Sequence, residues 1–212
     1  ERGYNLMYSD YEQKNFGTQL LVNPKLNFLN ISAQTGIAIR LSDSDKTTLS
    51  YILTQRAPNV SELFSDGLHH SLATIEYGNL TLDKETSHKV LLGFKKENTR
   101  LSFGIDSYLN SVSNFIYIEP TGVEQTTRGA FPVWSYNSTK VFMWGWDVFG
   151  EIQFAQDLEY TFNAAYTYAL DLTKNEPLIL VPPFAFNQQM AYTFSKKNIE
   201  ILHCVSQYPA DN

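Results

Sequence analysis

Residues 158–170 read LEYTFNAAYTYAL, and this stretch decides the fold. Its even positions carry large or apolar side chains, while its odd positions carry polar or small ones. Such a period of two is typical of a β-strand whose two faces meet different environments. The stretch is also longer than the roughly 5–6 residues of a common soluble strand, and it exceeds the roughly 9–11 residues that a tilted strand needs to cross a bilayer.

The same alternation recurs along the chain and predicts an all-β protein. It is clear at 101–109, 142–154 and 184–195. The pattern predicts nine strands, at residues 3–13, 27–41, 46–56, 85–96, 100–117, 136–154, 157–171, 184–195 and 198–208.

The links between these strands alternate strictly between long and short. The long links are 14–26, 57–84, 118–135 and 172–183, and the short links are 42–45, 97–99, 155–156 and 195–198. In an up-and-down barrel all turns at one end belong to one class, and outer-membrane barrels keep short turns on the periplasmic side and long loops outside. The alternation therefore favours an antiparallel up-and-down transmembrane β-barrel segment, with residues 1–212 in one β-barrel domain whose long links are extracellular loops.

Composition excludes several other classes of protein. The net charge of −6 argues against nucleic acid as a partner, because phosphate binding needs a basic face. Cys204 is the single cysteine of the sequence, so an internal disulfide framework and a cysteine-based zinc site are excluded. No apolar run reaches the roughly 18 residues of a transmembrane helix. We expect neither a metal nor a cofactor.

Aromatic side chains make up 14% of the sequence and gather near the ends of the predicted strands. Examples are Phe115 with Tyr117, and Tyr166 with Tyr168. Such rings suit a membrane–water interface. They suit cross-strand pairs in a soluble core equally well.

Residues 56–87 read RAPNVSELFSDGLHHSLATIEYGNLTLDKETS. This stretch resembles a signature of the TonB-dependent receptor barrel, in which Arg-x-Pro at a strand end precedes Glu-Leu-Phe, Gly-x-His and Glu-x-Gly-Asn-x-x-Leu-x-x-Glu. The matching residues are Arg56, Pro58, Glu62, Leu63, Phe64, Gly67, His69, Glu76, Gly78, Asn79, Leu82, Glu85 and Ser87. Leu80 and Asp83 stand where the family usually has proline, which bears on loop stiffness. The resemblance extends over about 45–195.

The resemblance implies a barrel of about 22 strands that is closed by an N-terminal plug domain. This chain would supply about nine strands from the later half of that barrel, without the plug. Because it begins at Glu1 and not at methionine, we expect a fragment or a mature segment.

The resemblance further implies a location in the outer membrane of a Gram-negative cell, in contact with its lipid. The expected partners are a TonB-type energy-coupling protein, which acts through the absent N-terminal region, and a scarce nutrient. That nutrient would be an iron–siderophore, a cobalamin-like molecule or a glycan. The polar-face carboxylates have no nucleophile beside them, so we expect no enzyme activity.

The expected ligand-contacting residues lie in or beside the long loops, because loops carry binding more often than scaffold strands do. They are His69, His70, Arg128, Trp134 and Tyr136. A metal at the two histidines is disfavoured, because adjacent side chains on a strand point to opposite faces. The other signature residues are expected to order the 57–84 loop: proline ends a strand, Gly-Asn suits a turn, and glutamates accept backbone N–H bonds.

The polar face of the strands is expected to point into the lumen. Asp106, Asp147, Glu151 and Glu159 lie on that face, and each would cost kilocalories if it faced lipid. Two other interpretations remain open: a plug-free outer-membrane porin, and a soluble all-β binding module. The porin should lack the 56–87 signature, and the soluble module should bury its apolar strand faces against each other.

Overall fold

The computed structural model describes residues 2–8, 11–15, 18–22, 25–179, 181–194 and 199–207. The chain divides into two compact units. The first unit comprises Glu1–Ala33, Leu53–Ser87 and Val112–Lys140. The second unit, which we call the wall, comprises Gln34–Ile52, His88–Ser111 and Val141–Asn212.

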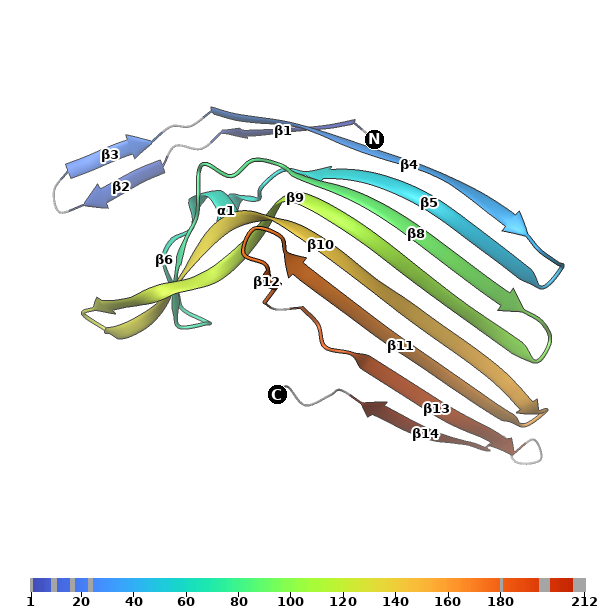
Figure 1. Cartoon of the computed structure of the whole chain (residues 1–212). Helices are drawn as coiled ribbons and strands as arrows, with labels where there is room; N and C mark the ends of the chain where they lie inside the picture. Colours follow the sequence, from blue (N-terminus) through green and yellow to red (C-terminus); the bar gives the residue numbers. More distant parts are fainter. Residues whose placement is uncertain are drawn as a thin grey trace. The chain divides into compact units, whose positions relative to one another are not determined.

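Strands make up most of the described chain, and Figure 1 labels most of them. The strands are β1 (Arg2–Tyr8), β2 (Tyr11–Asn15), β3 (Thr18–Val22), β4 (Lys25–Arg40), β5 (Asp45–Arg56), β6 (Asp66–His69), β7 (Thr74–Tyr77), β8 (Glu85–Glu97), β9 (Leu101–Thr126), β10 (Gly129–Ala155), β11 (Leu158–Asp171), β12 (Glu176–Pro177), β13 (Ala185–Phe194) and β14 (Ile199–Gln207). A short helix, α1 (Val60–Phe64), lies between β5 and β6.

The main sheet follows the order β1-β4-β5-β8-β9-β10-β11-β13-β14. Apart from the short strands inserted in the links, each strand pairs with the next along the chain. Strands along this path pair antiparallel, as between β10 and β11 and between β13 and β14. The predicted fold class, an antiparallel up-and-down all-β sheet, is therefore confirmed, and this path matches the nine predicted strands.

Each of the four predicted long links contains regular structure, with α1, β6 and β7 in 57–84 and β12 in 172–183. The link 118–135 is mostly strand, because β9 continues to Thr126 and β10 begins at Gly129. Prolines and glycines in this segment lowered the strand signal, but proline is tolerated where a strand has a free edge. The link 14–26 overlaps a hairpin of β2 and β3, so the predicted strand 3–13 is divided. The predicted turn 195–198 lies outside the described residues.

The wall exposes large apolar side chains at alternate positions on one face of its strands. Ile37 and Ile39 of β4, Leu92 of β8 and Leu109 of β9 are each more than half exposed. This arrangement differs from a soluble sandwich, in which the apolar strand faces pack against a second sheet.

Glycines in the wall let aromatic rings approach the backbone closely. A Cβ added to Gly104 would meet the ring of Phe149, and one added to Gly150 would meet the ring of Phe162. Aromatic rings that cover glycine in this way help to fix the register of a sheet.

Candidate ligand-binding cap

The first unit contains an elaborated region that we call the cap, formed by residues 57–84 together with residues 117–137 of the β9–β10 hairpin. Within it, β7 pairs antiparallel with β6 and parallel with β10, where Trp134 faces Glu76 in register. The 57–84 link therefore contributes two strands to a patch in the order β6-β7-β10.

Helix α1 is only five residues long, so it depends on its ends and on tertiary packing. Asn59 caps it by accepting the Glu62 N–H at 2.8 Å, and the Glu62 carboxylate accepts the Asn59 N–H at 2.7 Å. This reciprocal pair is a capping box. Leu63, which is 2% exposed, packs with Leu82 and Ile116 in a small apolar core.

The Gly-Asn pair of the signature closes against this helix. Gly78 N–H donates to the Ser65 carbonyl at 2.7 Å, and Asn79 N–H donates to the Glu62 carbonyl at 2.8 Å. A Cβ added to Gly78 would lie 2.5 Å from the Leu63 carbonyl carbon. A residue without a side chain is therefore required at position 78.

Arg56 joins two carboxylates of the signature. Its Nε donates to Glu85 Oε2 at 2.6 Å, and its Nη1 donates to both oxygens of Glu62 at 3.1 and 2.9 Å. Guanidinium suits this role because its donors form a fixed fork. Arg56, Glu62 and Glu85 therefore form one hydrogen-bonded network.

The structure brings two of the predicted ligand residues onto the same strand of the cap. Trp134 and Tyr136 lie on β10 and are half-buried. Tyr136 packs against the apolar core, and its carbonyl accepts from the Asn79 side chain at 3.3 Å. Burial raises the pKa of the Tyr136 phenol, and the nearby Glu76 carboxylate adds to that rise.

The other three predicted ligand residues lie in or beside turns. His69 ends β6, with its Nδ1 3.1 Å from the Ser71 hydroxyl, and His70 lies in the turn that follows. Arg128 lies in the turn between β9 and β10, where its N–H donates to Thr126 Oγ1 at 3.1 Å. All three are exposed.

A shallow pocket in the cap was not expected from the sequence. Its volume is about 170 Å³, and it is lined by Leu63, Phe64, Ser65, Asp66, Tyr77, Gly78 and Leu80. The Tyr77 hydroxyl donates to Glu124 at 2.8 Å across 47 positions of the chain, and this hydrogen bond raises the pKa of Tyr77 to about 12. The position of Tyr77 between two signature residues was the sequence feature that could have indicated this site. No sequence feature indicated Glu124, because its partner is distant in sequence.

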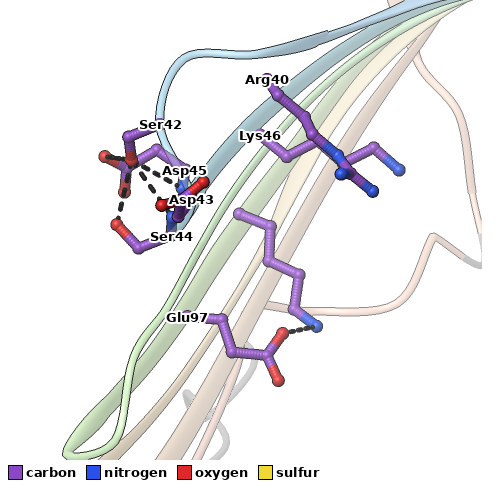
Figure 2. A pocket seen from close by; sticks show the side chains of 8 residues that line it. Arg40, Ser42, Asp43, Ser44, Asp45, Lys46 and Glu97 are labelled. Carbon is purple, nitrogen blue, oxygen red and sulfur yellow. Dashed lines mark hydrogen bonds and ion pairs between the residues drawn. The ribbon is translucent and has the colours of Figure 1, made fainter.

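The larger pocket of the wall is a weaker candidate. It measures about 350 Å³ and lies at the short link 42–45 (Figure 2). Its lining holds three cations and three carboxylates, namely Arg40, Lys46, Lys95, Asp43, Asp45 and Glu97. Lys95 lies 2.6 Å from Glu97, and Asp45 accepts from Lys96 at 2.9 Å, which lowers the pKa of Asp45. Because the charges of the lining balance, they favour neither a cationic nor an anionic ligand, so size alone does not decide between the pockets.

Within the described residues, no group of three or more His, Cys, Asp or Glu side chains is arranged to hold a metal ion. Over the same part of the chain, no helix has the length and apolar character needed to cross a membrane.

Solved structures similar to this chain are receptors and transporters. Copper transporter OprC matches with a TM-score of 0.71 and 16% identity over 90% of this chain and 28% of its own. The hemophore receptor HasR of Serratia marcescens, solved with its hemophore HasA and heme, matches with a TM-score of 0.67 and 14% identity over 99% of this chain and 39% of its own. The siderophore receptor PirA of Pseudomonas aeruginosa matches with a TM-score of 0.64 and 18% identity over 84% and 34%.

These likenesses show the fold, and the chain spans between about a quarter and two-fifths of the length of each of these proteins. The sequence also matches the family model described as "TonB dependent receptor-like, beta-barrel" over residues 3–202. The chain therefore belongs to the TonB-dependent receptor β-barrel family.

Proposed function

We propose that this chain supplies wall and ligand-contacting cap to an outer-membrane receptor that imports a scarce nutrient. The family match over residues 3–202 carries the proposal. The one-sided exposure of Leu92, Leu109 and their neighbours supports it, because lipid is a solvent in which such a face is stable.

In this proposal the wall crosses the outer membrane of a Gram-negative cell, and the long links 14–26, 57–84, 118–135 and 172–183 lie outside. A TonB-type energy-coupling protein drives import through a region beyond this chain. The chain performs no chemistry on its cargo, so the receptor is a transporter and not an enzyme. The cargo is an iron–siderophore, a cobalamin-like molecule or a glycan.

The cap contacts that cargo through His69, His70, Arg128, Trp134 and Tyr136. The half-buried rings offer stacking surface, and the exposed turn residues offer hydrogen bonds and charge. The small pocket beside Tyr77 is lined by both apolar and polar side chains.

Membrane fractionation with a heat-modifiability gel tests the location. We expect extraction only with detergent and a mobility shift on boiling. A monomer in plain buffer would instead favour a soluble all-β module, and an ion-permeable pore without energy dependence would favour a porin.

Binding assays on the intact receptor test the cap. Ferric chelates, haem, copper, cobalamin and oligosaccharides form the panel, and Trp134→Ala is compared with Leu72→Ala. We expect Trp134→Ala to weaken binding of the cognate ligand by about tenfold, as for a central aromatic contact. Equal affinities of both variants and the parent receptor would show that Trp134 does not contribute to ligand binding.

A further inference from the structure

Asn114 interrupts the regular backbone of β9. Its φ of 55° lies in the left-handed region, which Asn adopts more readily than most residues do. Its side-chain amide donates to the Lys84 carbonyl at 3.3 Å. Close by, the Ile116 N–H donates to Glu85 Oε1 at 2.6 Å. A carboxylate thus satisfies a backbone donor beside the interruption, as is needed wherever a strand ladder is disturbed.

The carboxylate of Glu85 also begins a continuous series of contacts to charged groups. Its second oxygen accepts from Arg56 Nε at 2.6 Å, and Arg56 Nη1 donates to both oxygens of Glu62. Glu62 in turn accepts the Asn59 N–H at the start of α1. Hydrogen bonds therefore run without a gap from β9, through β8 and β5, to the helix of the cap.

This series of hydrogen bonds differs from an ordinary surface ion pair, whose contribution to stability is small. The side chains of Glu62 and Glu85 are 11% and 14% exposed, so two mostly buried carboxylates share one guanidinium. Without that cation they would repel each other in a medium that screens poorly. A lysine ammonium lacks the fork that reaches both carboxylates from two different nitrogens.

We propose that Arg56 is the positioning residue of the cap, because it couples the placement of α1 to the interrupted backbone at Asn114–Ile116. This inference rests on the proposed function, in which the cap contacts the ligand. A displacement of either end is transmitted to the other through Glu85, Arg56 and Glu62.

Amide hydrogen exchange on the intact receptor in phosphatidylethanolamine–phosphatidylglycerol vesicles tests the coupling without any ligand. In Arg56→Met we expect exchange to quicken roughly tenfold both at 60–64 and at 114–116, since a bond to a charged group is lost at each end. The matched control is Lys96→Met, which breaks the wall pair with Asp45 at 2.9 Å. It should leave both segments of the first unit unchanged.

Glu85→Gln is the decisive variant, and it is nearly isosteric, so it serves even where Arg56→Met fails to fold. It removes no direct contact of α1, yet coupling predicts faster exchange at 60–64. Arg56→Lys should protect one of the two segments and not both. Unchanged exchange at 60–64 in Glu85→Gln, or full protection of both segments in Arg56→Lys, would overturn the proposal.

The result is separable from that of the ligand panel. Coupled exchange in a receptor that binds no member of the panel would count against nutrient import and leave the positioning role intact. Ligand binding without coupled exchange would do the reverse.

Discussion

In the cap, Leu63 and Ile116 bury their side chains in a small apolar core. In the wall, Ile37, Leu92 and Leu109 leave theirs exposed on one face of the strands. Both regions come from one chain of one composition, so the difference lies in what each is built to contact. Water forces the cap to gather its apolar groups inward. The exposed apolar face of the wall suits a surrounding of lipid.

The two regions also differ in how they use charge. The cap holds Glu62 and Glu85 largely buried and neutralises them with one arginine. At the short link of the wall, Lys96 pairs with Asp45, whose side chain is 22% exposed. Burial makes the partner of a charge indispensable, whereas exposed pairs contribute little. Disruption of the Arg56 network should therefore cost more than disruption of the Asp45 pair.

The strongest test of the comparison is Gly78→Ala. The new Cβ would lie 2.5 Å from the Leu63 carbonyl carbon and 2.7 Å from its oxygen, so α1 must move. We expect a loss of about 3 kcal/mol or more in the stability of the cap, at the upper end of overpacking costs. Amide exchange at 60–77 measures it, while exchange in the wall should stay the same.

Gly122→Ala is the matched control, because a Cβ there meets nothing within 4 Å. Equal exchange at 60–77 in the two alanine variants would contradict the required close approach at Gly78.

A charged residue introduced into each region tests whether that region contacts lipid or water. Leu92→Lys places an ammonium on the exposed face of the wall, where Leu92 is 51% exposed. If that face contacts lipid, the free energy of unfolding from vesicles should fall by about 2–4 kcal/mol, depending on depth. Urea titration followed by heat-modifiability measures the change.

Leu72→Lys provides the comparison, since Leu72 lies in a cap turn and is 64% exposed. Its effect should stay within about 0.5 kcal/mol, as for an ordinary surface substitution. A Leu92→Lys variant that is as stable as Leu72→Lys would contradict contact between the wall and lipid.

The smallest effect concerns pH in the cap. The hydrogen bond to Glu124 raises the pKa of Tyr77 from 10.0 to about 12, so the neutral phenol is favoured in the folded cap. Its contribution to stability is complete below pH 10 and disappears as the pH rises toward 12. Because Tyr77 is only half-buried, solvent screens this hydrogen bond, and we expect a contribution of less than about 1 kcal/mol.

The ultraviolet absorbance of the phenolate, taken as parent minus Tyr77→Phe, follows this titration. In Glu124→Gln the titration should shift back toward the ordinary value, since the negative charge is gone. A Tyr77 that ionises near pH 10 in the parent protein would exclude the hydrogen bond.

Local pattern predicted most strands of this molecule with nearly correct ends. Residues 157–171 were predicted and Leu158–Asp171 was found. The alternation is a local property, because neighbouring residues of a strand face two environments. The local pattern did not predict the strands within 118–135, because prolines and glycines obscured a hairpin that is stabilised by strand pairing.

The signature at 56–87 identified the family and located the cap, but it did not reveal the contacts within it. Glu85 lies 29 positions from Arg56, and Glu124 lies 47 positions from Tyr77. Which residues meet across such distances depends on strand register and on how the links close, and a local pattern encodes neither. The sequence by itself therefore determined the strands, the apolar face and the family. Only the tertiary structure decided that Arg56 joins Glu62 to Glu85, because that contact exists only once three separate strand and loop ends are brought together.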